Sequence, residues 1–249
     1  MFKVAKESGL GTIWLPVTAA TTLYVGQMVT TSQGFATAFG AASGTPDTDR
    51  PIGIVVATND KTPTYSSTYN AHYITGVASQ ADQLARKWQG AQGMWSVGDP
   101  MAMVQVELIG KDTVIQGTFG GALTAFNPAD ASTTGAAITK SEASQGTVDY
   151  NTIFYCRSGA NKGIYRVNGN DNNDNSKTAS NFPVYWPYDV ATTDYYVRAN
   201  VTLGLSKAQF DSLSMYVDPT NALSKYYSII VEEVDLSTSG LETVTFRFA

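Results

Sequence analysis

The feature that most constrains the fold is the alternation of apolar and polar residues over short stretches of the chain. Near the end of the sequence, Val244, Phe246 and Phe248 alternate with polar residues, as in a β-strand whose side chains point to opposite faces. Apolar or alternating runs of this length recur between turn-forming residues at 13–17, 23–29, 52–57, 72–78, 101–109, 152–157, 163–167, 195–203 and 226–234. Many short strands are typical of sandwiches and barrels. We therefore expect an all-β protein made of two β-barrel or β-sandwich domains.

Helical patterns are scarce, and the sequence predicts one or two short helices. Residues 79–89 could form three turns, with Leu84 and Trp88 one turn apart. Ser206 and Gln209 match a helix capping box and are followed by Phe210. We expect a helix to begin at Ser206.

A stretch rich in Gly, Ala, Ser and Thr divides the predicted strands into two groups. It covers residues 117–147 and lacks strong periodicity, which is typical of a linker or an adaptable loop. We expect an N-terminal β-barrel domain at 1–116 and a C-terminal β-sandwich domain at 148–249.

The charge balance argues against nucleic acid as a partner. Affinity for nucleic acid comes mainly from Lys and Arg that neutralise phosphates, whereas here 16 basic residues are scattered among 21 acidic ones, for a net charge of −5. The first nine residues lack the apolar core of a secretion signal. No stretch approaches the roughly 18 apolar residues that span a membrane. We expect a protein made in a cytosol and soluble there, with no membrane or nucleic-acid partner.

The residues that commonly carry catalysis are few. His72 is the single histidine, and any Ser-His-Asp or Cys-His site would need it as the base. Cys156 is the single cysteine, which excludes an internal disulfide or a Cys-based zinc cluster. Glu232 and Glu233 are neighbours in a predicted strand, so their side chains should point to opposite faces. We expect a non-enzymatic protein with no catalytic residue, cofactor or metal; a hydrolase with scattered carboxylates remains an alternative.

Two polar or aromatic stretches of the second half are candidate binding sites. The stretch that begins at Asn168 and ends at Ser176 is rich in side-chain oxygens, which can hold calcium. It departs from the EF-hand pattern, and Asn and Asp also dominate simple turns, so a solvated loop is favoured and calcium binding is left open. Tyr185, Trp186 and Tyr188 form a candidate binding surface, as do Tyr65 and Tyr69 nearer the N-terminus. Packing within β layers is the favoured reading for most of these rings.

Two segments of the first half resemble the small β-barrel proteins that decorate the heads of tailed bacteriophages. Residues 25–57 contain Val-Gly-Gln-Met-Val, then a polar connection, then Arg-Pro-Ile-Gly-Ile-Val-Val-Ala. The family pattern is similar, with Val-x-x-Gly-x-x-Val followed by Pro-Ile-Gly-Ile-Val. Residues 98–106, Gly-Asp-Pro-Met-Ala-Met-Val-Gln-Val, resemble strand entries of phage virion proteins. Roughly 130 residues fall outside these modules and would form a second domain.

The resemblance implies a capsid decoration protein, and it brings no catalytic residues. A member of this family would lie on the capsid surface of the virion, be assembled in the host cytoplasm and bind the major capsid protein. It would form a homo-oligomer, with a trimer favoured. The alternative is a phage tail or receptor-binding protein with a carbohydrate-binding surface, suggested by the ring of Trp186 and its neighbours. The absence of a 20-residue helical pattern favours an accessory protein over the major shell protein.

Overall fold

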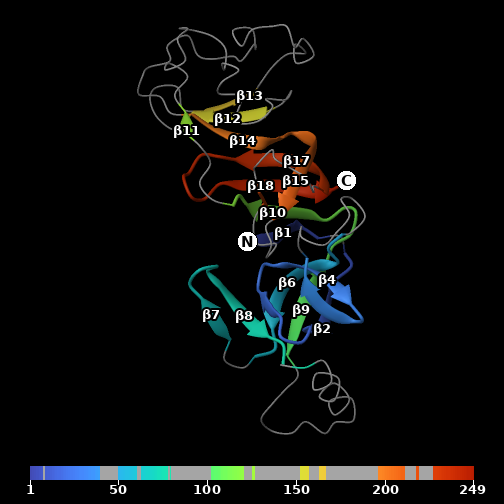
Figure 1. The fold of residues 1–249 in the computed structure, drawn as a ribbon. Helices are drawn as coiled ribbons and strands as arrows, with labels where there is room; N and C mark the ends of the chain where they lie inside the picture. Colours follow the sequence, from blue (N-terminus) through green and yellow to red (C-terminus); the bar gives the residue numbers. More distant parts are fainter. Residues whose placement is uncertain are drawn as a thin grey trace, which may run out of the picture. The chain divides into compact units, whose positions relative to one another are not determined.

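The protein is all-β in a computed structural model that describes residues 1–7, 9–39, 50–60, 63–77, 79, 102–120, 125–126, 152–156, 163–166, 196–210, 217–218 and 227–249. Among these residues there is no helix. The chain forms two compact units: unit 1 comprises Met1–Gly117 and Phe210–Tyr216, and unit 2 comprises Thr118–Gln209 and Val217–Ala249 (Figure 1). Most of the expected linker at 117–147 lies outside the described residues, so the predicted domain limits stay a prediction.

Unit 1 is built on a five-stranded antiparallel sheet in the order β2-β9-β6-β4-β5. Its strands are β2 (Thr12–Pro16), β4 (Met28–Ser32), β5 (Phe35–Ala38), β6 (Gly53–Thr58) and β9 (Met103–Leu108). The predicted strands at 13–17, 52–57 and 101–109 are therefore confirmed. β5, which follows a tight turn at residues 33–34, was not predicted.

The five-stranded sheet curls until its two edges meet at one point. Directly after β2, Val17 forms a parallel bridge with Ala36 of β5. Thr18 supports the bridge, because both its N–H and its Oγ1 donate to the Ala36 carbonyl oxygen at 2.9 Å. A single bridge is not a ladder, so the described strands do not make the closed barrel that we expected. The structure is a strongly curled open sheet.

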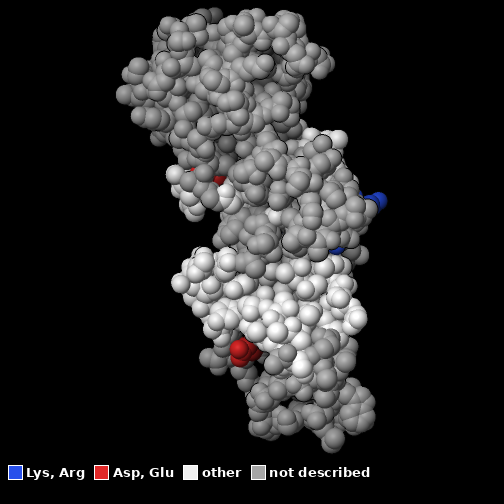
Figure 2. All heavy atoms as spheres, viewed as in Figure 1, with Lys and Arg blue, Asp and Glu red and all other residues white. Residues whose placement is uncertain are grey.

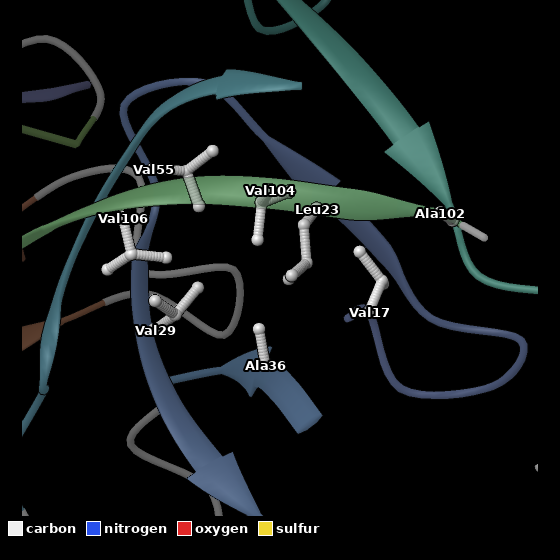
Figure 3. Packing of buried hydrophobic residues seen from close by; sticks show 8 residues of the cluster. All are labelled: Val17, Leu23, Val29, Ala36, Val55, Ala102, Val104 and Val106. Atoms are coloured by element: carbon white, nitrogen blue, oxygen red, sulfur yellow. The ribbon is translucent and has the colours of Figure 1, made fainter. Parts of the chain in front are cut away.

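The interior of the curled sheet is filled by small and branched apolar side chains. On β9, Val104 and Val106 alternate with Gln105 and Glu107, so the valines face inward. They meet side chains from the other strands of the sheet and from β3, and the cluster comprises Val17, Leu23, Val29, Ala36, Val55, Ala102, Val104 and Val106 (Figure 3). Five of the eight precede the long connection between β8 and β9, and the other three lie at its end or in β9. Both sequence regions of unit 1 are therefore needed for one core.

A three-stranded sheet adjoins the curled sheet, in the order β3-β8-β7. It consists of β3 (Thr22–Tyr24), β7 (Thr64–Ser66) and β8 (Ala71–Thr75), and Figure 1 shows β7 and β8 as an antiparallel pair beside the curled sheet. The predicted strand at 72–78 is confirmed in β8. β7 lies between the predicted strands at 52–57 and 72–78, where no strand was predicted.

The expected single strand at 23–29 is wrong, because a turn divides it between two sheets. Gly26 has a φ of +87°, a conformation that favours glycine, and its N–H donates to the Val55 carbonyl oxygen at 2.7 Å. The fully buried Gln27 fixes the turn, since its Oε1 accepts from the Tyr24 N–H at 3.0 Å. β3 thus ends at Tyr24 and β4 begins at Met28. A run of seven mostly apolar residues thus contains a change of chain direction.

Two further strands and one aromatic cluster complete unit 1. β1 (Phe2–Lys6) pairs antiparallel with β10 (Val114–Thr118), with Phe2 opposite Gly117. Phe210 packs against Phe2 and Phe39, with ring centroids 5.7 and 6.0 Å apart. All three rings are buried. Phe210 is far from the other two in sequence, which is why unit 1 includes a late segment of the chain.

Unit 2 contains two groups of paired strands. In the first, β18 (Thr243–Phe248), β17 (Tyr227–Asp235), β15 (Gly204–Phe210) and β16 (Val217–Asp218) are neighbours in this order. In the second, the order is β11 (Ala125–Phe126), β14 (Tyr196–Thr202), β12 (Thr152–Cys156) and β13 (Gly163–Arg166). The predicted strands at 152–157, 163–167, 195–203 and 226–234 are all confirmed, as is the strand predicted from the alternation of Val244, Phe246 and Phe248.

The last two strands show the clearest alternation in the molecule. Val244 and Phe246 are fully buried and Phe248 nearly so, while the residues between them are partly exposed. β17 has a bulge between Val231 and Glu233, which interrupts the alternation of side chains between the two faces. We expected Glu232 and Glu233 to point to opposite faces of a regular strand; both are exposed. Glu232 Oε1 lies 3.3 Å from Arg247 Nε. Without hydrogen-bond alignment at that nitrogen, this is a surface ion pair that contributes at most about 1 kcal/mol.

The helix expected to begin at Ser206 is wrong, because residues 204–210 form β15. This strand pairs antiparallel with β17, with Ser206 opposite Ile229. Ala208 and Phe210 are buried and Leu205 is exposed, which is the two-residue period of a strand. A capping residue contributes about 1 kcal/mol, less than a full strand ladder with a buried phenylalanine. The other expected helix, at 79–89, lies outside the described residues apart from Ser79.

Candidate functional site

The second-half residues proposed from the sequence as binding sites lie outside the described part of the chain. This holds for Tyr185, Trp186 and Tyr188 and for the stretch from Asn168 to Ser176. Their roles stay predictions. Among the described residues, no three His, Cys, Asp or Glu side chains gather closely enough to hold a metal ion. In the same residues, no helix has the length and apolar character needed to cross a lipid bilayer.

His72 is an exposed residue of β8. It stands opposite Tyr65 of β7, and the two rings meet edge to face with centroids 5.4 Å apart. The Tyr65 hydroxyl donates to Asn70 Oδ1, which fixes the phenol ring over the turn between β7 and β8. Cys156 is the last residue of β12 in unit 2, and its side chain is not described. The described contacts of His72 are thus those of a surface aromatic pair.

Three tyrosines pack together on the opposite face of the three-stranded sheet. The ring of Tyr24 lies 4.8 Å from that of Tyr69 and 5.5 Å from that of Tyr73. Burial raises the pKa of the Tyr24 hydroxyl, and the neighbouring Tyr69 and Tyr73 hydroxyls raise it further. These rings contact one another and are partly buried, so Tyr69 belongs to a packed cluster. Tyr65 is more than half exposed.

The most unusual exposed feature of unit 1 is its edge strand β2. One edge of β2 pairs with β9 from Thr12 opposite Glu107 to Pro16 opposite Met103. No described strand pairs with the other edge over residues 12–15. Ile13 is 38% exposed and Trp14 is 46% exposed, although they point to opposite faces of the strand. Both faces of this edge therefore present large apolar side chains.

A shallow pocket of about 210 Å³ lies beside β2. It is lined by residues of the preceding segment, of β2, of β9 and by Val56, which stands at the bulge of β6. Gln105 donates through Nε2 to Thr12 Oγ1 at 2.9 Å, which ties β9 to β2 across the outer face. Leu10 at the rim is 57% exposed and Val56 is 38% exposed. The pocket is thus lined by both polar and apolar side chains.

Two carboxylates share this pocket. Burial raises the pKa of Glu107, and the nearby charge of Glu7 raises it further. Like charges this close disfavour the ionised form. No described residue that lines the pocket is Lys or Arg, so no lining cation offsets the repulsion. A cation supplied from outside the unit would be attracted here.

We refer to these residues together as the β2 surface: Leu10, Ile13, Trp14 and Val56 with Glu7 and Glu107. The sequence argument missed it. The alternation in Ile13-Trp14-Leu15 contained a signal, because two adjacent large apolar residues cannot both face one core. The meeting of Glu7 and Glu107 had no such signal, because 100 residues separate them and only the strand pairing brings them together.

Comparisons with protein-family models, with curated proteins and with solved structures found no match to this chain. Function is therefore inferred from the residues of the chain itself. Figure 2 shows that, on the face drawn, the described surface over β2, β4 and β6 to β9 is mostly uncharged, with acidic atoms gathered at a single spot. A surface of this kind suits contact with another protein better than contact with a polyanion.

Proposed function

We propose that the chain is a non-enzymatic virion structural protein that decorates or stabilises a bacteriophage capsid by binding the major capsid protein. The observation that carries the proposal is the apolar edge strand β2, exposed on a unit whose interior is otherwise well packed. Long apolar edges are normally paired, covered or charged in proteins that act alone. An exposed one therefore supports a role in assembly with other chains.

The phage part of the proposal rests on the two sequence segments that resemble decoration proteins. In the structure, Gly53 of the Pro-Ile-Gly-Ile-Val segment sits in β6 against β9, where a Cβ atom would collide with the Glu107 carbonyl oxygen and with Val106. Gly26 of the Val-Gly-Gln-Met-Val segment supports the turn between β3 and β4. These two glycines thus allow the turn after β3 and the close approach of β6 to β9 in the curled sheet.

The expected assembly is a homo-oligomer, with a trimer favoured, on the outer surface of the capsid. The test has two parts. Light scattering coupled to size exclusion should give a mass near three times 26.6 kDa for the purified chain. Quantitative mass spectrometry of gradient-purified particles should find the chain in a fixed ratio to the major capsid protein. A chain that is absent from particles would rule out the proposal.

The alternative of a carbohydrate-binding tail or receptor protein rests on Trp186 and its aromatic neighbours. A glycan array probed with the full chain and with Trp186→Ala tests it. Binding that is lost in the variant would replace the capsid proposal by the carbohydrate one. No glycan binding by the wild-type chain would remove the alternative.

A further inference from the structure

We infer that the β2 surface binds an extended segment of a partner protein, which adds as a strand beside β2 and places a Lys or Arg between apolar side chains. The inference rests on the proposed function only for the identity of that partner, which would be the major capsid protein. The surface, the binding mode and the chemistry of the segment follow from unit 1 itself.

The backbone of β2 provides the first argument. The N–H and C=O groups of residues 12–15 that point away from β9 have no partner strand among the described residues. Edge strands that must stay free are usually blunted by Lys, by a central Pro or by a bulge. β2 has none of these before Pro16, and its pairing with β9 is regular over all five residues. Such an edge is a template for an added strand.

The side chains provide the second argument. An added strand would lie next to Ile13 on one face and Trp14 on the other, so alternate apolar residues of the partner would cover both. Trp is the residue most often found to anchor protein interfaces. Leu10 and Val56 extend the apolar area on the face of Trp14 toward the pocket. The partner segment should therefore be apolar on both sides of its central residue.

The pocket charge provides the third argument and identifies the central residue. Glu7 and Glu107 face the same pocket, and no described lining residue is a cation. Burial raises the pKa of Glu107 in the free protein, and repulsion from Glu7 raises it further. A Lys or Arg side chain from the partner would relieve this repulsion and form charge-assisted hydrogen bonds. The two carboxylates thus lower the stability of the free chain and favour binding of a cationic partner segment.

The same charges argue against a second copy of the chain as the occupant. Two copies related by a two-fold axis would present the same patch to each other. Each would bring its own Glu7 and Glu107, and the interface would gather four carboxylates with no described cation. A partner of opposite charge therefore fits the surface better than a copy that meets it across a two-fold axis.

Selection from a random peptide library tests the inference without knowledge of the partner. Displayed peptides about nine residues long, the length of a long strand, are selected on the immobilised full chain. The enriched peptides should carry one Lys or Arg flanked by apolar residues. A synthetic copy should bind the chain and shift the amide NMR signals of residues 12–15. Its Lys→Glu or Arg→Glu counterpart should bind at least about tenfold more weakly, a loss of about 1.4 kcal/mol.

Variants of the chain localise the binding. Trp14→Ser should abolish peptide binding, and Glu107→Gln should weaken it about tenfold. Leu241→Ser is the matched control, because it removes another exposed apolar side chain, in unit 2, and it should bind the peptide as the wild-type chain does. Glu107→Gln keeps the test decisive even where Trp14→Ser folds poorly. Peptides without a cation, or binding that survives both Trp14→Ser and Glu107→Gln, would overturn the inference.

The remaining outcomes separate this inference from the proposed function. A wild-type oligomer that dissociates in Trp14→Ser would identify a second copy as the occupant and overturn the inference. A chain that is absent from virus particles but binds the selected peptides at β2 would overturn the proposed function alone. If the chain is abundant on particles but the β2-surface variants leave peptide binding unchanged, the inference alone would be overturned.

Discussion

Strands β18 and β2 both carry large apolar residues but have different surroundings. Both are short and rich in large apolar residues, Val244, Phe246 and Phe248 in β18 and Ile13 and Trp14 in β2. In β18 these side chains are at most 8% exposed, whereas Ile13 and Trp14 of β2 are at least 38% exposed. The apolar residues of β18 lie on one face and meet a core; those of β2 lie on both faces of an edge. The first set stabilises the fold, and the second is available to a partner.

The largest expected effect on stability comes from a substitution in the buried strand β18. Phe246→Ala removes a fully buried ring that lies 5.9 Å from the ring of Phe248. We expect it to lower the free energy of unfolding by about 3–5 kcal/mol, since large-to-small core substitutions leave a cavity. Urea unfolding of the full chain measures it. Leu241→Ala, at a residue 68% exposed, is the control and should cost less than about 0.5 kcal/mol.

The next effect tests whether the curled sheet is as close-packed as its glycines indicate. Gly53→Ala places a Cβ against the Glu107 carbonyl oxygen and Val106, and overpacking of this kind costs about 1–3 kcal/mol. Gly34→Ala is the control: its φ is +83° but open space surrounds it, so it should cost only about 1 kcal/mol through backbone strain. Equal losses in the two variants would mean that β6 and β9 can move apart freely.

A smaller loss of stability is expected from a substitution in the exposed strand β2. Trp14→Ser removes a ring that is nearly half exposed, and we expect a loss of roughly 1 kcal/mol, since only part of its area is buried in the free chain. Urea unfolding of Trp14→Ser measures this loss, which can be compared directly with that of Phe246→Ala. A loss as large as that of Phe246→Ala would make Trp14 a core residue and β2 a structural edge.

The smallest expected effect has the opposite sign. Because the pKa of Glu107 is raised by burial and by Glu7, its protonated form stabilises the fold below the ordinary glutamate pKa of about 4.3. That stability is lost as the pH rises through the higher folded-state pKa. Glu107→Gln should therefore melt at a higher temperature than the wild-type chain at pH 7.

Measuring the difference in melting temperature between Glu107→Gln and the wild-type chain at low pH provides the control. Thermal unfolding at about pH 3, below the ordinary glutamate pKa, should show the two proteins nearly equal, because Glu107 is then protonated and resembles Gln. A Gln variant that is less stable than the wild-type chain at pH 7 would show that the carboxylate has a stabilising partner.

The sequence predicted the fold where the local pattern and the sheet pairing agree. The runs that became β6, β9, β17 and β18 read correctly because apolar residues that alternate or cluster between turns have few other structures available. The helix at Ser206 failed because a capping pattern describes a few neighbouring residues, whereas β15 is held by a partner strand more than 20 residues later. The mostly apolar run at 23–29 contained an unpredicted turn, at which the polar residue Gln27 is fully buried.

The candidate site was less accessible to sequence reasoning than the fold. The exposure of Trp14 depends on β2 being an edge, and the edge is defined by which strands pair, not by the residues of β2. The register of β2 on β9 places Thr12 opposite Glu107, and no local pattern encodes that register. The aromatic residues that we proposed instead were chosen by residue type alone. One of them, Tyr69, packs its ring against Tyr24.

Hydroxyl-radical footprinting of Trp14 tests the central claim most directly. Trp14 and Tyr65 are 46% and 52% exposed in unit 1, so both should be oxidised in the free chain, and Tyr65 serves as the internal reference. On purified virus particles, oxidation of Trp14 should fall strongly relative to Tyr65, because a partner strand would cover β2. The same ratio of Trp14 to Tyr65 oxidation in free and particle-bound protein would contradict the account.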